Sequence, residues 1–307
     1  LGAYVFRGYK STEPAPRATE VAVTGAAADD AAERAAILGS AVALVKDLTT
    51  MPADRLGPED LAARSIEAVA GLPIEVEVLD EDQLAELGMR ALLGVGQGSE
   101  SPSKVVVMRW QGGGEAAPLA LVGKGVVFDT GGISIKPSEG MEDMKWDMGG
   151  AAAVSGLMHA LAGRKAKVNA VGVLGLVENM PDGRAQRPGD IVRSMKGDTI
   201  EVVNTDAEGR LILCDALTYA QRFEPQALVD VATLTGACMI ALGTQASGLM
   251  SKLDALANEL LAAGEQVFDR AWRLPLWDEY QGQLDSQFAD VYNIGGRWAG
   301  AITAGCF

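Results

Sequence analysis

Apolar residues recur at helical spacing in the segment that follows a stretch rich in proline, threonine and alanine near the N-terminus. Between 29 and 47 the apolar positions lie three and four residues apart, and Asp29 or Asp30 can cap the first turn. The pair Met51-Pro52 ends the pattern, since proline cannot continue a helix. We therefore predict a long helix over 29–47.

Short apolar runs typical of strands alternate with helical patterns in the rest of the chain. The predicted strands are 74–79, 104–110, 118–123, 168–176 and 227–232, and the predicted helices are 81–87, 149–162, 209–222 and 253–268. This alternation favours an α/β fold in which a mixed, mainly parallel sheet is sandwiched between helices. Residues 1–27 begin with a strand-like run at 3–6 and continue as a predicted linker.

Composition narrows the classes of function. The net charge of −15 repels phosphate backbones and argues against nucleic acid as a partner. The three cysteines lie far apart in the sequence, which does not suit a disulfide framework and indicates a reducing, cytoplasmic compartment. Apolar runs are interrupted before they reach the roughly 18–20 residues that span a bilayer, so we expect no membrane segment.

Three glycine-rich segments place charged residues directly after predicted strands. They are 119–137, 144–151 and 204–211, and they contain the carboxylates Asp129, Asp147, Asp206 and Glu208. Loops at strand ends are where α/β sheets bind ligands, and four carboxylates converge in a dry cleft only when cations neutralise them.

Divalent metal is the simplest such cation. The single histidine, His159, excludes a histidine-rich zinc site and is expected to be a packing residue within a helix. An oxygen-rich pair of sites suits zinc, manganese, magnesium or cobalt, with no sharp preference. Two such ions activate water and polarise a scissile carbonyl, so hydrolysis needs no protein nucleophile. A G-x-S-x-G elbow is absent, and one histidine makes a serine or cysteine triad improbable.

The segment 204–211, which reads Asn-Thr-Asp-Ala-Glu-Gly-Arg-Leu, resembles the signature of the leucyl (M17, cytosol) aminopeptidase family. Similar matches, in the family's order, are residues 124–136, 144–151, 183–184, 187–190, 231–237 and 293–297. These motifs are spread over most of the chain and are highly specific.

The resemblance implies a role for each matching residue. Asp129 and Glu208 would each bind both of two divalent ions, Asp206 would bind one ion, and Asp147 with the neutral amine of Lys124 would complete the other. The resemblance also assigns residues beyond the metal ligands. Lys136 would stabilise the oxyanion, Arg210 would hold a bicarbonate that acts as general base, and the pocket for the first side chain would be lined by Met144, Thr233, Leu234 and Gly236.

The family's properties set further expectations. The substrate would be a peptide with a free N-terminus and a leucine-like first residue, and the assembly would be a homohexamer. Residues 1–27 would be the tail of a mostly absent N-terminal α/β domain plus a linker, 28–50 a connecting helix, and 51–307 the catalytic domain, truncated at its C-terminus.

Two other functions compete with this interpretation. One is a non-catalytic, truncated relative with a regulatory or scaffold role, against which the complete set of metal ligands argues. The other is a two-metal phosphoesterase. It is disfavoured because Gly123-Lys124-Gly125 lacks the Ser or Thr that follows in a phosphate loop.

Overall fold

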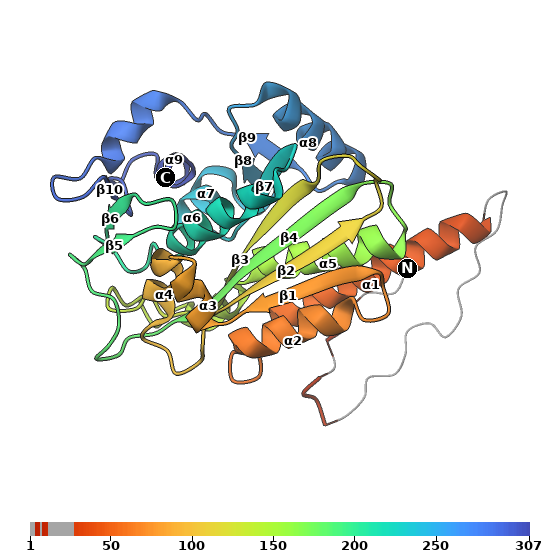
Figure 1. Ribbon diagram of the computed structural model, residues 1–307, viewed down its shortest axis with the longest axis horizontal. Helices are drawn as coiled ribbons and strands as arrows, with labels where there is room; N and C mark the ends of the chain where they lie inside the picture. The colour runs from red at the N-terminus through yellow and green to blue at the C-terminus, as the bar shows by residue number, and fades with distance from the viewer. Residues whose placement is uncertain (1–3, 7, 12–27) are drawn as a thin grey trace.

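A five-stranded mixed sheet forms the centre of the computed structural model, which describes residues 4–6, 8–11 and 28–307 (Figure 1). In spatial order its strands are β1 (Ile74–Leu79), β2 (Lys104–Gln111), β4 (Asn169–Asn179), β3 (Leu119–Asp129) and β7 (Ala227–Val231). β1, β2 and β4 pair antiparallel, whereas β4, β3 and β7 pair parallel. The predicted mixed sheet is confirmed, and its parallel half is the part that carries the charged loops.

Helices cover both faces of this sheet, as predicted. One layer contains α1 (Ala28–Thr50), α2 (Pro58–Ala68) and α5 (Gly149–Gly163), and the other contains α3 (Glu81–Glu86), α4 (Arg90–Gly96) and α6 (Gly209–Ala220). Successive residues of β2 face opposite layers: Val105 and Val107 pack in one core cluster, Val106 and Met108 in the other. A strand buried on both faces reads as a continuous apolar run, which is why β2 was recognisable in the sequence.

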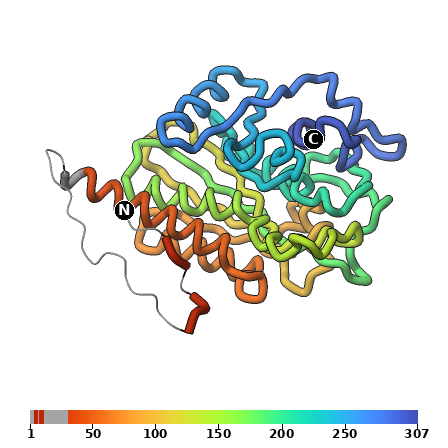
Figure 2. Tube along the Cα trace, turned by 180° about the vertical axis from the view of Figure 1, so that it is seen from behind, coloured from red at the N-terminus to blue at the C-terminus, as the bar shows by residue number. Residues whose placement is uncertain are grey.

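The C-terminal third of the chain gathers beside β7, the edge strand of the sheet (Figures 1 and 2). The remaining helical elements are η1 (Met141–Trp146), η2 (Gln221–Phe223), α7 (Gly236–Leu242), α8 (Asp254–Val267), η3 (Asp278–Leu284) and α9 (Gly300–Cys306). Two small sheets combine β10 (Val291–Tyr292), β6 (Thr199–Glu201) and β5 (Ile191–Arg193), and β8 (Ser247–Leu249) with β9 (Ala271–Arg273).

The sequence pattern placed most large elements well but missed α2 and α4. Helix α2 is short and on average polar, and Leu61 and Ala62 are its apolar core residues, so it offers few apolar positions to detect. Helix α4 contains Gly94 and Gly96, which lower helix propensity and hide the pattern.

Strand β3 extends to Asp129, six residues beyond its predicted end at 123. The prediction stopped there because glycines usually mark a loop. Gly123 instead lies inside the strand, where a Cβ would stand only 2.7 Å from the Cα of Ala151 in α5. Glycine here allows helix and sheet to approach closely, and the longer strand carries Lys124 into the protein interior.

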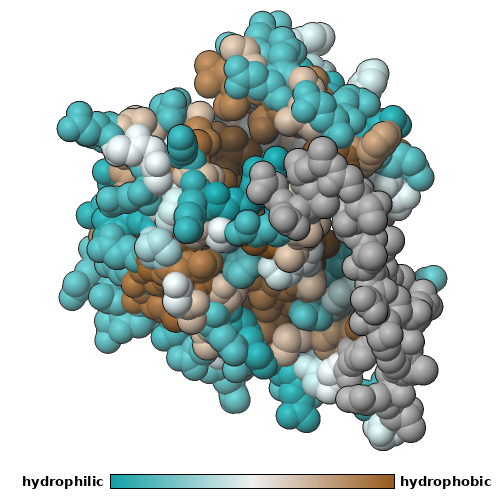
Figure 3. Space-filling view, turned by 90° about the vertical axis from the view of Figure 1, so that its right-hand side faces the viewer, coloured by the Kyte–Doolittle hydropathy of each residue, from teal (hydrophilic) through white to brown (hydrophobic). Residues whose placement is uncertain are grey.

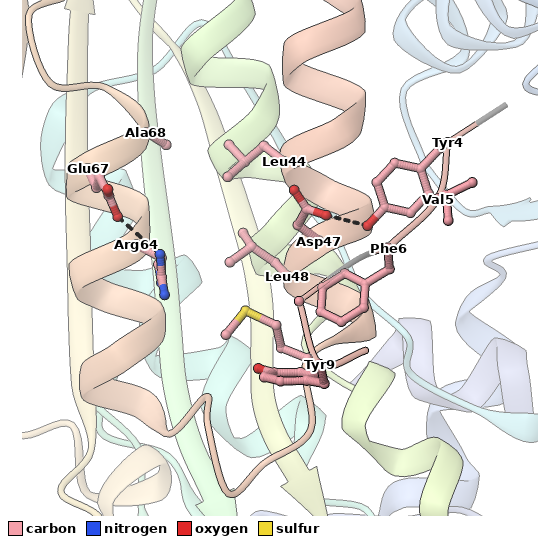
Figure 4. A pocket seen from close by; sticks show the side chains of 12 residues that line it. Tyr4, Val5, Phe6, Tyr9, Leu44, Asp47, Leu48, Arg64, Glu67 and Ala68 are labelled. Carbon is pink, nitrogen blue, oxygen red and sulfur yellow. Dashed lines mark hydrogen bonds and ion pairs between the residues drawn. The ribbon is translucent and has the colours of Figure 1, made fainter. Parts of the chain in front are cut away.

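The first described residues lie against α1 (Figure 4). The Tyr4 hydroxyl donates to the carboxylate of Asp47 in α1, and burial together with this contact raises the pKa of Tyr4 to about 12. The strand expected at 3–6 is wrong for residues 4–6, which belong to no strand; Ala3 and most of the predicted linker lie outside the described residues.

The long helix predicted over 29–47 is confirmed as α1, with a few more residues at its C-terminal end. His159 links α1 to its neighbours in the same helical layer, as expected of a packing residue. The His159 ring, in α5, hydrogen bonds to Ser40 Oγ in α1 (3.0 Å) and to the Ala68 carbonyl oxygen in α2 (2.7 Å).

The face in Figure 3 mixes polar and apolar side chains. Among the described residues, no helix combines the length and the apolar character needed to cross a bilayer.

Candidate metal centre

The three charged segments meet at the carboxyl ends of the parallel strands β3, β4 and β7. Asp129 is the last residue of β3 and is paired in register with Asn179, the last residue of β4. Thr233 follows β7 by two residues, and the loop 202–208 connects β6 to α6 beside them. Because parallel strands end at one edge of a sheet, residues far apart in the sequence lie within contact distance here.

Lys124 is the centre of one half of the cluster. It was expected in a loop after the strand, but it lies within β3 and is only 2% exposed. Its Nζ lies 2.7 Å from Asp147 Oδ1 and 2.9 Å from Glu208 Oε1, and it donates to the Thr233 carbonyl oxygen at 2.8 Å. The Thr233 hydroxyl also donates to Asp147 Oδ1, at 2.8 Å. A buried ammonium is tolerated here because three acceptors surround it.

Lys136 is the centre of the other half. Its Nζ lies 2.7 Å from Asp129 Oδ2 and also pairs with Asp206 Oδ1. The second oxygen of Asp129 accepts from the Gly131 amide (2.9 Å) and from Asn179 Nδ2 (2.7 Å). Asp129 therefore has one oxygen anchored by neutral donors and one directed toward the Lys136 ammonium.

Burial and charge act in opposite directions on this cluster. Burial lowers the pKa of Lys124, but the carboxylates of Asp147 and Glu208 outweigh it and hold that pKa above its usual value. Burial raises the pKa of Asp147 well above normal, although Lys124 opposes the shift. Burial likewise raises the pKa of Asp206 to about 6 against the opposing effect of Lys136. The two lysines therefore offset the effect of burial on Asp147 and Asp206 only in part.

The residues present fit divalent cations. Asp129, Asp206 and Glu208 each offer an oxygen, and these oxygens lie within 4.8 Å of one another. Asp147 Oδ2 is buried and has no hydrogen-bond partner among the described residues. Four carboxylates face only two ammonium groups, so additional positive charge stabilises the site. The acidic cluster can thus hold divalent metal through oxygen ligands, the donor set that the sequence predicted.

Arg210 lies in the first turn of α6, close to this cluster in sequence and buried. Its Nε and Nη1 have no hydrogen-bond partner in the described part of the chain. Burial lowers the pKa of Arg210 to about 10, so the guanidinium still carries its charge at neutral pH. Unpaired guanidinium donors suit a small oxyanion, which they bind in a planar, two-pronged geometry.

Of the four residues predicted to line a pocket, Thr233 and Leu234 lie beside the cluster. Thr233 contacts Lys124 and Asp147 directly, and Leu234 lies close to Gly209, where a Cβ would stand 2.9 Å from Leu234 Cδ1. Gly236 begins α7 and faces open space. Met144 is half-buried in η1, and its carbonyl accepts from the Asp147 amide at 3.2 Å.

Sequence reasoning missed the neutral residues that hold the cluster together. Asn179 Nδ2 donates to Asp129 and, at 3.1 Å, to the Thr205 carbonyl oxygen. The Thr205 hydroxyl donates to the Gly131 carbonyl oxygen (2.6 Å) and accepts from the Ser134 amide (2.8 Å). The only signal in the sequence was position, since Asn179 follows an apolar strand and Thr205 lies beside Asp206.

A family model described as "Cytosol aminopeptidase family, catalytic domain" matches residues 43–307. Curated proteins called "Probable cytosol aminopeptidase" are similar over most or all of the chain. The protein from Caulobacter vibrioides is 58% identical over 100% of this chain and 64% of its own length. The protein from Xanthomonas campestris is 58% identical over 94% of this chain and 59% of its own length. The chain thus spans less than two thirds of the length of these relatives.

A solved structure described as "Bottromycin maturation enzyme BotP in complex with Mn" has the same fold. Its TM-score is 0.87 at 39% sequence identity, and the match covers 92% of this chain and 62% of that one. The predicted arrangement of a mixed sheet between helices is therefore found in a relative whose structure was solved in complex with Mn.

Proposed function

Since this chain belongs to the cytosol aminopeptidase family, we propose that it carries the catalytic site of a metal-dependent aminopeptidase, which removes the first residue of a peptide. The observation that carries the proposal is the cluster of four carboxylates around Lys124 and Lys136. Such a deficit of positive charge at the ends of parallel strands suits cations and cationic ligands, and the substrate's free amino group is a cation.

Two divalent ions would be held by this chain's own oxygens and one amine. Asp129 and Glu208 would bind both ions, Asp206 one of them, and Asp147 with Lys124 the other. Bound ions would supply Lewis acidity, which activates water at neutral pH and polarises the scissile carbonyl. Zinc or manganese is proposed, with magnesium or cobalt as further candidates; the manganese in the solved relative supports an ion of this class.

The protein residues position the substrate and the charge that develops on it. Lys136, which is partly exposed beside Asp129, donates to the carbonyl oxygen as that oxygen becomes negative. Water adds to the carbonyl carbon, the C–N bond breaks, and the departing amine takes up a proton. Arg210 would hold a bicarbonate that supplies the general base, a role supported by its two unpartnered nitrogens.

The position of the anchoring charge explains exopeptidase specificity. The amino group of the substrate must lie near the carboxylates, so only the first peptide bond reaches Lys136. Thr233, Leu234, Gly236 and Met144 border the place for the first side chain. Half-buried Leu234 and Met144 suit leucine-like groups.

We propose a homohexamer in the cytoplasm, with residues 51–307 as the catalytic domain, 28–50 as a connecting helix and 1–27 as a domain tail and linker. The names of the matched relatives, "Probable cytosol aminopeptidase", support the location and the reaction.

Hydrolysis of leucine para-nitroanilide by protein stripped of metal tests the proposal. Activity is expected to be absent after chelation and to return when manganese or zinc is added. The parallel substrate para-nitrophenyl phosphate distinguishes the phosphoesterase and should not be hydrolysed. Protein that binds metal but hydrolyses no aminoacyl substrate would contradict the proposal and favour a regulatory or scaffold role.

A further inference from the structure

Asn293 lies far from the carboxylates in sequence but is hydrogen bonded to the loop that carries two of them. It follows β10, which pairs parallel with β6, and its backbone amide donates to the Glu201 carbonyl oxygen at 3.0 Å. The side chain is completely buried. β10 thus brings Asn293 alongside residues 203–207, the segment that leads to Glu208.

All four side-chain hydrogen bonds of Asn293 go to the backbone of this segment. Its Oδ1 accepts from the Val203 amide (2.8 Å) and the Asn204 amide (3.2 Å). Its Nδ2 donates to the carbonyl oxygens of Asn204 (2.6 Å) and Ala207 (3.4 Å). An asparagine amide has two donors and two acceptor lone pairs, so its capacity is used completely.

The segment needs such a partner because its backbone lacks the regular hydrogen bonds of a strand or helix. β6 ends at Glu201 and α6 begins at Gly209, so the residues between them are neither strand nor helix. Buried backbone groups outside regular structure must find other hydrogen bonds. One side chain supplies four of them on both sides of Asp206, and thereby sets where that residue points.

We propose that Asn293 is a positioning residue of the metal centre, which fixes the backbone of 203–207 so that Asp206 and Glu208 present their oxygens to divalent cations. The inference rests on the proposed function, since it assumes that the cluster binds metal. Residues that orient metal ligands by hydrogen bonds typically change metal affinity or activity by about 10–100-fold when they are replaced.

Asn169 provides a matched control, since it lies at the end of β4 that is remote from the metal centre. Its Nδ2 donates to the carbonyl oxygens of Gly114 and Ala116, and its Oδ1 accepts from the Gly113 amide. It therefore clamps an irregular segment in the same way as Asn293. β4 is eleven residues long, so roughly 30 Å separates Asn169 from the strand end at the metal centre.

Titration of metal-free protein with Mn²⁺ tests the proposal, with free Mn²⁺ measured by electron paramagnetic resonance. Asn293→Ala is expected to weaken Mn²⁺ binding by about 10–100-fold, with an unchanged far-ultraviolet circular dichroism spectrum. Asn169→Ala should lose thermal stability but keep the parental dissociation constant. Unchanged Mn²⁺ affinity in Asn293→Ala, or equal losses in both variants, would overturn the positioning role.

Asn293→Asp carries the test if the alanine variant does not fold. It keeps the size of the side chain and the accepting oxygen but loses both donors. The added negative charge by itself favours cation binding, so a dissociation constant larger than that of the parent reports the lost donors. A dissociation constant equal to or smaller than that of the parent overturns the proposal. A parent protein that bound no Mn²⁺ would instead contradict the proposed function, which separates the two failures.

Discussion

Two lysines in one cluster differ in what surrounds them. Lys124 is enclosed in β3 with three oxygen partners, whereas the Lys136 side chain is 19% exposed on the loop that follows. A lysine with access to the cleft can meet a substrate oxygen, and an enclosed lysine can act only on its immediate partners. The sequence did not reveal this difference in exposure, because both lysines lie in the same glycine-containing segment, 119–137.

Replacing Lys136 should therefore affect turnover more than metal binding. Lys136→Ala is expected to lower kcat for leucine para-nitroanilide by about 10²–10³-fold, the usual effect of losing one donor to a developing oxyanion. Metal content, measured by mass spectrometry, should stay close to that of the parent. Asp206→Ala and Glu208→Ala should both abolish metal-dependent activity, because each removes a proposed metal ligand.

Lys145 offers a control for the loss of a lysine side chain. It lies in η1 near Asp147 in sequence, and its ammonium stands over the Trp146 ring, 5.9 Å from the centroid. Lys145→Ala should leave kcat nearly unchanged. Near-parental turnover in Lys136→Ala would remove Lys136 from the mechanism.

At the scale of elements, the cluster depends on how closely α5 approaches the sheet. Helix α5 begins two residues after Asp147, so its docking affects the position of that carboxylate. At Gly150 a Cβ would stand 1.9 Å from the Val231 carbonyl oxygen of β7, a backbone atom that cannot rotate away. At the neighbouring Gly149 the nearest atom would be Thr233 Cγ2 at 3.4 Å, which is an ordinary contact.

These neighbouring glycines should respond differently to the same substitution. Gly150→Ala is expected to lower the free energy of unfolding by about 1–3 kcal/mol or more, because the helix must move away from the sheet. Gly149→Ala should change it by less than about 1 kcal/mol. Urea unfolding followed by circular dichroism measures both. Equal stability of the two variants would show that α5 can shift without cost.

At the scale of the whole molecule, Asp215 joins segments that are distant in sequence. It is fully buried on α6, and its two oxygens accept from the Leu92 amide in α4 (2.9 Å) and from the Met195 amide after β5 (2.7 Å). Burial raises the pKa of Asp215 to about 6, although the backbone donors oppose the shift. The folded protein thus holds a proton on this group more tightly than the unfolded chain does.

This pKa predicts a pH-dependent contribution to stability. Because the folded pKa is raised, the contribution is greatest below the unfolded value of 3.8 and is lost as pH rises through about 6. The difference in free energy of unfolding between the parent and Asp215→Ala should shrink between pH 4 and 7, by at most about 3 kcal/mol. Urea titrations across this range measure it, and a difference that stays constant or grows with pH would contradict the assignment.

The sequence by itself determined the parts whose physical signal is local. Apolar periodicity revealed α1, the central strands and α5, because burial on one or both faces leaves a repeating pattern. The carboxylates and lysines were recognisable because charged residues in a glycine-rich loop that follows an apolar strand often belong to a functional site. Family motifs then assigned roles that spacing alone could not.

Only the tertiary structure decided the rest. Helix α4 and the extension of β3 depend on close packing around glycine residues. Local propensity alone predicts a loop at glycine. Asn179 and Asn293 became visible as supports because β4 and β10 deliver them to backbone groups far away in the sequence. A neutral amide adds neither charge nor apolar periodicity to the sequence, so its hydrogen bonds can be recognised only in the folded chain.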